Sequence, residues 1–351
     1  MQPKTNGHKM PDKNDPTISI ILPVYNRPEY TDQALASIRR STYRDYEIIV
    51  VDDCSGDETI EVIKKHKPDV FIRNDENHGP FYCRNIAAGH ARGKILYFSD
   101  TDVVIAEDTL AKVHKHLIDD GLECVIGLYS IEHPNKNLCS IYKNSWIRYS
   151  YLQSGEYVNW FFTAVGAVRK DVWDKNREFD NQKSNKTGSG DIVFGRSLAE
   201  HGVRILLDRQ LEVVHLKHFN IITLLENDFL RAYGWSKASL DIDKRIATIT
   251  RKGFANVSTS FLMKTFLSGV MIASIAALFF THYAWTVLIA SLLIYTICAI
   301  PFLRFMKTHF SLAKAVLCLP LMIVDTTVCG FGIFSSLVVI FFSRIKKALT
   351  T

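Results

Sequence analysis

Short hydrophobic runs alternate with amphipathic segments over residues 17–220. Residues 17–23 and 46–53 each contain an apolar run, and residues 30–40 between them have the pattern of a helix. Residues 95–98 are four consecutive strand-forming side chains, which is typical of a strand covered on both faces of a parallel sheet. This order predicts an α/β domain with a mostly parallel central sheet.

The second half of this region has weaker patterns. Residues 107–120 are predicted to form a helix and residues 124–129 a strand. Residues 131–157 are rich in aromatic side chains without clear periodicity, and we expect them to form an irregular insertion or a substrate-facing loop. Two further strands are predicted at residues 203–207 and 211–216.

The pattern changes after residue 220. Residues 223–241 mix aromatic and basic side chains, which favours a helix in the membrane interface, although a helix packed on the soluble domain would look similar. Residues 261–280 and 283–303 are almost uncharged, and about 20 residues suffice to cross a bilayer. Residues 315–342 are also apolar but include Pro, Asp and Gly, so we expect a long, broken segment.

These changes divide the chain into four parts. Residues 1–16 are polar and lack the apolar core of a signal peptide, which predicts a disordered tail. Residues 17–220 form the α/β domain, residues 221–256 an interfacial helix and linker, and residues 257–351 a transmembrane region.

Net charge separates the two halves of the chain. Residues 257–351 hold seven Lys or Arg residues and one Asp, so their net charge of +6 equals that of the whole chain. Residues 1–256 are therefore formally neutral and offer no basic stripe for nucleic acid. The seven cysteines are scattered without a C-x-x-C pair, which favours a reducing compartment over a disulfide framework or zinc site.

Basic residues also predict the topology. The charged loop at residues 304–314 marks the cytoplasmic side, so we expect a multi-pass inner-membrane protein whose α/β domain faces the cytoplasm. The basic tail after residue 342 conflicts with a single third crossing. Either the charge rule fails there or the last stretch is re-entrant. The sequence leaves the oligomeric state open.

The main candidate for chemistry follows the run at residues 95–98. Asp100 and Asp102 lie where ligands of open α/β sheets collect, outside the carboxyl end of a central strand. Mg²⁺ typically takes one or two protein carboxylates together with substrate phosphate oxygens, which suits a nucleotide diphosphate. An Asp-rich turn without a ligand would have the same sequence.

Three other positions are candidates. Arg84 lies near the start of a predicted helix, a common anion site, although a solvated Arg is the simpler interpretation. Asp191 follows a Gly-rich stretch and is either a mobile catalytic carboxylate or a helix N-cap. His215, at a strand end, can ligate a metal or be satisfied by hydrogen bonds. No G-x-G-x-x-G follows the first strand, which argues against a dinucleotide-binding dehydrogenase.

Five motifs occur in an order that resembles family 2 glycosyltransferases of the GT-A nucleotide-diphospho-sugar transferase fold. They are P-V-Y-N-R at residues 23–27, V-V-D-D-C-S-G-D at 50–57, N-H-G-P-F-Y-C-R-N at 77–85, D-T-D at 100–102 and G-S-G-D at 188–191. The H-L-K and R-A-Y-G-W segments and the hydrophobic C-terminus also resemble membrane-anchored bacterial members. The Gln-x-x-Arg-Trp motif of processive synthases is absent from the sequence, which argues against polymerisation.

The resemblance implies a role for each matching residue. Asp191 would be the general base, a position that the family usually places after Glu and that here follows Gly190. Asp100 and Asp102, with His215 as a further ligand, would bind Mg²⁺ or Mn²⁺. The implied nucleotide-sugar-binding residues are Pro23, Tyr25, Asn26, Asp52, Asp53, Asn77, Gly79, Arg84 and Asp100.

The resulting hypothesis is a membrane-bound inverting glycosyltransferase. It would move a sugar from a nucleotide-sugar donor to a hydroxyl of a membrane lipid or lipid-linked glycan acceptor, as in cell-envelope polysaccharide synthesis. One alternative is a polyprenyl-phosphate glycosyltransferase, for which no proton need be removed from the acceptor. Another is a non-catalytic nucleotide-sugar-binding membrane scaffold, in which the three aspartate sites would have no role.

Overall fold

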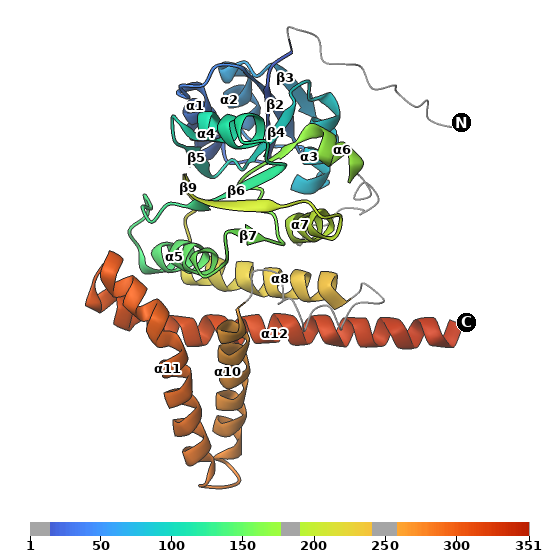
Figure 1. Ribbon diagram of the computed structural model, residues 1–351. Coiled ribbons are helices and arrows are strands. Elements are labelled where there is room, and N and C mark those ends of the chain that lie inside the picture. The colour runs from blue at the N-terminus through green and yellow to red at the C-terminus, as the bar shows by residue number, and fades with distance from the viewer. Residues whose placement is uncertain (1–14, 177–189, 241–257, 351) are drawn as a thin grey trace. The chain divides into compact units, whose positions relative to one another are not determined.

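The computed structural model of the chain describes residues 15–176, 190–240 and 258–350 (Figure 1). These residues form two compact units. Unit 1 contains the described parts of residues 1–127, 162–184 and 203–211, and unit 2 the described parts of residues 128–161, 185–202 and 212–351. Most of the predicted disordered tail, the Gly-rich stretch before Gly190 and most of the predicted linker after Leu240 lie outside the described residues.

Unit 1 is built on a mixed sheet in the order β3-β2-β1-β4-β8-β6-β9-β5. Its first four strands are parallel, with Ile18 beside Tyr46 in β2 and beside Ile95 in β4. The strands are β1 (Ile18–Val24), β2 (Tyr46–Asp52), β3 (Val70–Arg73), β4 (Ile95–Ser99), β5 (Val103–Ile105), β6 (Cys124–Tyr129), β8 (Val165–Arg169) and β9 (Ile205–His215). Strands β6 and β9 continue into unit 2, where β7 (Tyr157–Val158) pairs with β9.

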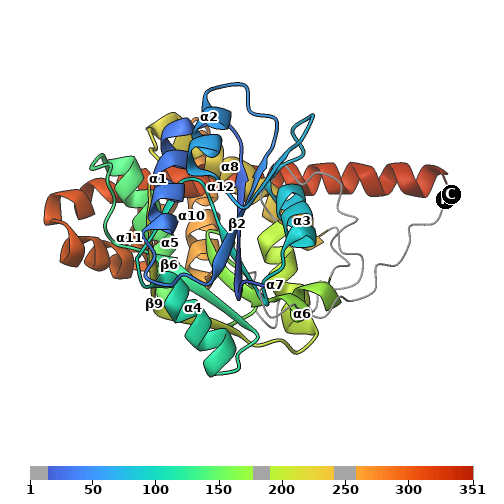
Figure 2. The ribbon, with the colours of Figure 1, turned by 90° about the horizontal axis from the view of Figure 1, so that it is seen from above.

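Burial explains why the apolar runs became central strands. Every residue of β1 and β4 is buried, because helices cover both faces of the sheet. Helices α1 (Pro28–Arg39) and α2 (Thr59–His66) lie on one side and α3 (Pro80–His90) on the other (Figure 2). Unit 1 is completed by α4 (Thr109–His114), a π-helical turn (Lys115–Asp119) and α6 (Lys170–Lys175). The predicted α/β domain with a central strand before Asp100 is confirmed.

The far half of the sheet differs from the prediction. β8 runs antiparallel to both β4 and β6, so the sheet is mixed where we expected it to be mostly parallel. The two strands predicted at residues 203–207 and 211–216 are one strand, β9. β6 and β9 approach so closely that a Cβ at Gly127 would lie 2.0 Å from the Leu211 carbonyl oxygen. Strand direction is set by such pairings, which local sequence does not encode.

Unit 2 contains α5 (Leu138–Leu152), α7 (Gly190–Glu200) and α8 (Ile221–Leu240). The expectation of an irregular loop over residues 131–157 was wrong, because most of it is α5. Asn137 caps this helix by accepting a hydrogen bond from Ser140 N at 3.0 Å. Lys143, Asn144 and Ser145 are buried on α5, and these buried polar residues obscure the usual helical pattern.

Three helices in the described residues are long and apolar enough to cross a membrane. They are α10 (Thr259–Ala277), α11 (Ala284–His309) and α12 (Leu312–Thr350). α10 and α11 form a hairpin that extends away from α8 and α12, whereas α12 runs alongside α8 (Figure 1). α12 is continuous through Pro320, where the sequence predicted a broken segment.

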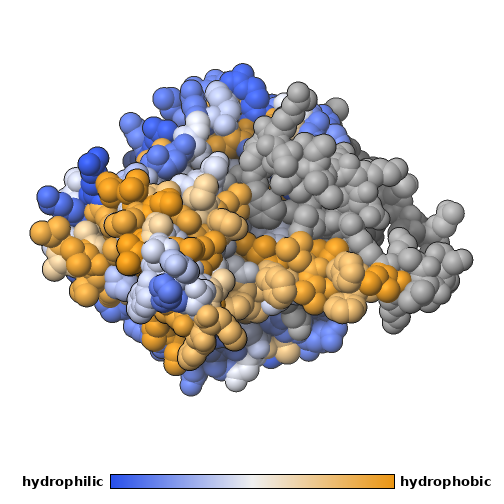
Figure 3. Space-filling model, turned by 90° about the horizontal axis from the view of Figure 1, so that it is seen from below, coloured by the Kyte–Doolittle hydropathy of each residue, from blue (hydrophilic) through white to orange (hydrophobic). Residues whose placement is uncertain are grey.

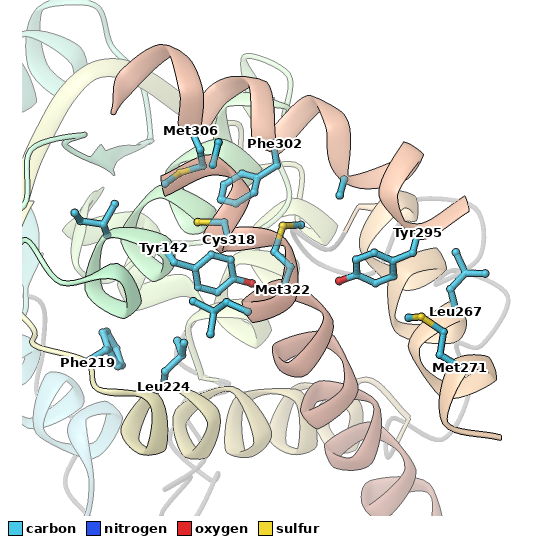
Figure 4. Packing of buried hydrophobic residues seen from close by; sticks show 14 residues of the cluster. Tyr142, Phe219, Leu224, Leu267, Met271, Tyr295, Phe302, Met306, Cys318 and Met322 are labelled. Atoms are coloured by element: carbon cyan, nitrogen blue, oxygen red, sulfur yellow. The ribbon is translucent and has the colours of Figure 1, made fainter. Parts of the chain in front are cut away.

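A hydrophobic cluster joins these helices to α5. Tyr142 of α5 lies beside Phe302 of α11 and Cys318 and Met322 of α12, while Tyr295, Leu267 and Met271 lie farther along the hairpin (Figure 4). The two Tyr hydroxyls need polar partners in this apolar setting, and Tyr295 finds one in Thr326 at 3.0 Å. Unit 2 is therefore a helical assembly with a core of its own.

Candidate functional site

Two acidic sites lie at the carboxyl ends of two parallel strands in unit 1, β2 and β4. Asp52 ends β2 and Asp53 follows it, while Asp100 follows β4 and Asp102 lies in the turn before β5. Only β1 separates β2 from β4 in the sheet. The fold therefore brings together acids that are almost fifty residues apart in the sequence, at the edge where ligands of α/β sheets bind.

Asp52 and Asp53 are both buried and bound by the chain itself. Asp52 accepts a hydrogen bond from Ser55 N at 3.2 Å and faces Arg73 Nε at 3.4 Å. Asp53 accepts hydrogen bonds from His78 N at 3.0 Å and Gly79 N at 2.7 Å. A further bond comes from the side-chain amide of Asn74, at 2.8 Å. Asp53 thus fixes residues 74–79, the loop that precedes α3.

Two predicted residues of that loop depend on Asp53. Gly79 has a φ of 92°, a conformation that L side chains rarely adopt, and it places its N–H on the Asp53 carboxylate. Asn77 donates its side-chain amide to the Asp53 carbonyl oxygen at 3.4 Å. Burial, with the neighbouring Asp53 charge, also raises the pKa of the Cys83 thiol, which therefore stays protonated.

The loop after β1 is held by a residue that sequence reasoning did not select. Ser55 Oγ accepts a hydrogen bond from Asn26 N at 2.8 Å, and Asn26 Oδ1 accepts one from Gly56 N at 3.1 Å. Asn26 has a φ of 55°, which this bonding stabilises. Pro23 pairs with Val51 in the sheet, and Tyr25 is 49% exposed, so its ring remains accessible. Ser55 lies within the D-D-C-S-G motif, but only the fold shows that it accepts a hydrogen bond from Asn26.

Arg84 of α3 forms an ion pair with Asp100. The Arg84 side chain is 6% exposed and that of Asp100 is 32% exposed, so the pair reaches the surface through its acid. Arg84 Nε is buried and has no hydrogen-bond partner among the described residues. An arginine anchored on one side, with a donor still unused, suits an oxyanion ligand.

The carboxylates of this edge suit a hard divalent cation. Asp100 and Asp102 supply oxygen ligands from one short turn, as Mg²⁺ and Mn²⁺ prefer. Within the described ranges, no three or more His, Cys, Asp or Glu residues come together as a metal cluster. Asp100 and Asp102 would thus supply a pair of carboxylates here, and substrate phosphates would supply further oxygen ligands.

Asp191 lies in unit 2, in the first turn of α7, and accepts a hydrogen bond from Ile192 N at 2.8 Å. α7 is held closely against Trp160 and Phe161, because a Cβ at Gly195 would lie 2.1 Å from Phe161 N. The rings of Phe161 and Phe194 pack edge to face at 5.2 Å. This close packing fixes the helix that carries Asp191.

Arg231 of α8 is electrostatically linked to Asp191. Burial alone would lower the pKa of Arg231, but the Asp191 carboxylate raises it above its usual value. The guanidinium lies over the Trp235 ring, 5.0 Å from its centroid. Both residues belong to the R-A-Y-G-W segment, which the sequence marked only as a resemblance.

Arg231 and Trp235 line a cavity of about 90 Å³ within unit 2. Helices α5, α8, α10 and α12 form its walls, which include the Trp146 ring and the ion pair between Lys143 and Asp228. Trp235 Nε1 is buried without a hydrogen-bond partner in the described parts of the chain. The cavity therefore offers two hydrogen-bond donor groups, Arg231 and Trp235, beside apolar walls.

Sequence reasoning missed the Lys143–Asp228 pair entirely. Both residues are buried and lie 85 positions apart, on α5 and α8. Burial by itself would raise the pKa of Asp228, yet the Lys143 ammonium holds it below its usual value. No local pattern could have joined these residues, since each lies alone in an ordinary helical segment.

His215 lies in unit 2 at the end of β9, whereas Asp100 and Asp102 belong to unit 1. Its ring is buried and stacks on Tyr129 at 4.2 Å, with His133 edge-on at 5.9 Å. Burial, with the nearby His133, lowers the pKa of His215 well below its ordinary value, so the imidazole is neutral. A neutral imidazole is the form that ligates metal, and the assignment of His215 as a ligand stays a prediction.

The fold has a counterpart among solved structures. The mannosyltransferase PcManGT of Pyrobaculum calidifontis, in complex with GDP-Man and Mn²⁺, superposes with a TM-score of 0.54 over 95% of this chain and 91% of its own, at 18% identity. This chain has the GT-A fold, and its described residues include three later helices that are apolar enough to cross a membrane.

Sequence comparison supplies the family. Residues 19–176 match the model of glycosyl transferase family 2, and they form a domain of that family. An uncharacterized glycosyltransferase of Haemophilus influenzae is 36% identical over 121 residues, which are 33% of this chain and 48% of that protein. The poly(ribitol-phosphate) β-N-acetylglucosaminyltransferase TarP of Staphylococcus aureus is 28% identical over 169 residues, 46% of this chain and 51% of TarP. The chain thus spans about half the length of these relatives.

Proposed function

We propose that the protein is a membrane-bound, metal-dependent inverting glycosyltransferase. It takes a sugar from a nucleotide-diphosphate sugar and transfers it to a hydroxyl of a membrane-associated glycan or lipid. The observation that carries the proposal is the cluster at the ends of β2 and β4, where Asp52, Asp53 and the Arg84–Asp100 pair meet in one unit.

The donor half of the reaction belongs to unit 1. The exposed Tyr25 ring and the loop fixed by Asp53 hold the nucleoside, and the free donor of Arg84 approaches the diphosphate. Asp100 and Asp102 would hold Mg²⁺ or Mn²⁺, which when bound offsets negative charge on the departing nucleoside diphosphate. The GDP-Man and Mn²⁺ bound by PcManGT support this assignment.

The acceptor half belongs to unit 2. Asp191 removes the proton of the acceptor hydroxyl as it attacks the anomeric carbon, and the Arg231 guanidinium interacts electrostatically with that carboxylate. The cavity beside Arg231 is walled partly by the apolar helices α10 and α12, which suits an acceptor carried by the membrane. The polymer acceptor in the name of TarP supports an envelope glycan. By the distribution of basic residues, the enzyme lies in the inner membrane with unit 1 in the cytoplasm.

The first experiment tests the donor site. Detergent-purified protein is incubated with a panel of nucleotide sugars and Mn²⁺ or Mg²⁺, with and without membrane lipid extract, and nucleoside diphosphate release is measured. Asp102→Ala and EDTA should each abolish release, the latter reversibly. The control is Asp108→Ala, an acid of unit 1 that is 56% exposed and pairs with Lys112. Full activity of Asp102→Ala would overturn the metal site, and no release with any donor would favour the non-catalytic scaffold.

The second experiment tests the acceptor. If a hydroxyl is deprotonated, Asp191→Asn should lower kcat about 10²- to 10⁴-fold, the usual contribution of a general base. The cation Arg231 favours one alternative, an anionic acceptor such as polyprenyl phosphate, for which the loss should be small or confined to KM. Glu200→Gln, at the other end of α7, serves as the control. If Asp191→Asn weakened donor binding while turnover at saturation stayed normal, the base assignment would be wrong.

A further inference from the structure

The length of α12 is the starting observation. Its 39 residues would measure about 58 Å at 1.5 Å per residue, roughly twice the ~30 Å hydrocarbon core. The 19 residues of α10 measure about 28 Å, close to the thickness of that core. α12 therefore matches a membrane in composition but not in length.

One stripe of α12 is buried by protein, and its middle part packs against α8. Gly332 lies so close to α8 that a Cβ there would be 2.6 Å from the Phe229 carbonyl oxygen. One turn earlier, Cys329 Sγ lies 3.9 Å from the Asp228 carbonyl oxygen. The buried residues of this stripe continue at helical spacing in both directions, at Ala315, Cys318, Met322, Asp325, Ser336 and Ile340.

The partner helix α8 cannot enter hydrocarbon. It exposes Glu226 and Lys237 and also carries the buried Asp228 and the half-buried Arg231. Placing such charges in the bilayer core costs several kcal/mol each, roughly 2.5–3.5 on the insertion scale. Since α12 lies alongside α8, α12 could cross the core only by drawing these charges in with it.

At Asp325, α12 is tied through a second helix to the parts of β6 and β9 that belong to unit 2. Asp325 accepts a hydrogen bond from the hydroxyl of Tyr142 of α5 at 2.6 Å. On the same helix, Arg148 donates to the Tyr129 carbonyl oxygen at 2.7 Å and pairs with Glu212 at 2.6 Å, at the ends of β6 and β9. The centre of α12 thus lies one helix away from strands that carry a charged, partly exposed ion pair.

The opposite stripe of α12 is apolar and open. Exposed apolar side chains recur along it every seven residues, at Leu317, Val324, Phe331 and Val338. These four residues and Phe334 are each 36–63% exposed. Figure 3 shows this hydrophobic surface running along α12, on the same face from which the α10–α11 hairpin projects. An apolar helix can lie flat in a membrane surface here, because protein rather than water covers its inner side.

We propose that α12 lies flat in the membrane interface, so that only α10 and α11 cross the bilayer and the C-terminus stays on the side of α5 and α8. The proposal rests on the membrane attachment stated above. It places the basic loop at residues 304–314 and the basic tail after residue 342 on one side, as the positive-inside rule requires. The exposed aromatic residues of the hairpin turn, Phe279, Phe280, Tyr283 and Trp285, then meet the other interface.

Depth measurements provide the first test. Nitroxide labels are placed singly at Leu317, Val324, Phe331 and Val338 of the full chain in lipid vesicles, and depth is read from collisions with oxygen and a water-soluble nickel complex. Seven residues advance about 10.5 Å along a helix, so a spanning α12 would give a steady gradient of depth. We expect instead that the four depths agree within about one helical turn, ~5 Å.

The control is Phe266 and Ile275 of α10, which are exposed on the hairpin and nine residues apart. Their depths should differ by about 13 Å, which shows that the method resolves a spanning helix in the same protein. A gradient along α12 like that along α10 would overturn the proposal.

Labelling from one side of the membrane provides the second test. Glu58→Cys in unit 1, Thr281→Cys in the hairpin turn and Ser343→Cys near the end of α12 are treated with an impermeant maleimide in sealed vesicles. We expect the maleimide to label Ser343→Cys from the same side of the membrane as Glu58→Cys, and to label Thr281→Cys only from the opposite side. If Ser343→Cys were labelled from the same side as Thr281→Cys, α12 would cross the bilayer and the proposal would fail. If all three reacted from one side, the hairpin itself would not cross, which removes the membrane attachment but leaves the transferase assignment intact.

Discussion

Replacing Asp53 by Asn changes one atom at the centre of the loop formed by residues 74–79. The Asp53 carboxylate receives two hydrogen bonds on Oδ1, from Asn74 Nδ2 and His78 N, and one on Oδ2, from Gly79 N. Asn at this position keeps one acceptor oxygen for the first two donors. Its NH₂ group then faces the Gly79 N–H, which loses its acceptor.

The magnitude follows from that single lost bond. A buried hydrogen bond to a charged group contributes about 1.5–3 kcal/mol, and each 1.4 kcal/mol is about tenfold in an equilibrium constant. Local opening of residues 74–79 should therefore become about 10- to 150-fold more frequent. Because the carboxylate is occupied by the chain itself, we expect a raised KM for the donor with little change in kcat.

Hydrogen exchange of the peptide covering residues 74–84, in the detergent-solubilised full chain, measures this opening. The matched control is Asp108→Asn, whose carboxylate is exposed and bonds only to Lys112 within the described part of unit 1. Exchange in Asp53→Asn that equals that of the unmodified protein would refute the role of Asp53 as the anchor of this loop. An equal rise in Asp108→Asn would show that the effect is not local.

The remaining predictions concern unit 2. Asp228→Asn leaves the Lys143 ammonium buried without its partner, which should lower the free energy of unfolding by about 3–5 kcal/mol and so lower the thermal midpoint. The double variant Lys143→Met with Asp228→Leu should restore most of that stability. Because the Lys143 ammonium holds the pKa of Asp228 below its ordinary value in the folded protein, the pair contributes fully above that ordinary value and is lost only as pH falls through the folded pKa. Thermal midpoints of the unmodified protein and Asp228→Asn should therefore differ by a constant amount from about pH 8 to 5, and a difference that shrinks across that range would contradict the assignment. Gly195→Ala should displace α7, which carries Asp191, from Phe161 and so lower kcat. Donor affinity, measured by titration calorimetry, should stay the same. Unchanged turnover would mean that the position of α7 does not matter.

The sequence determined the features that depend on near neighbours along the chain. The apolar runs ending at Asp53 and Asp100 were enough to predict buried strands with acids at their carboxyl ends, because a strand covered on both faces has no polar positions. The two apolar spans became α10 and α11 for a similar reason, since length and hydropathy are properties of a segment alone. The family motifs also lie within single loops.

Tertiary structure decided everything that joins distant segments. The antiparallel half of the sheet, the use of Ser55 by Asn26 and the Lys143–Asp228 pair depend on contacts that no local pattern contains. Helix α5 was missed because its polar residues are buried by partners elsewhere in the fold, which removes the contrast on which periodicity depends. Composition alone predicted a long, broken apolar segment at residues 315–342, but the contacts of Gly332 and Asp325 in α12 show that one side of this helix is covered by protein. Hydropathy reports how a segment partitions from water, and only the fold determines whether protein or lipid takes the place of that water.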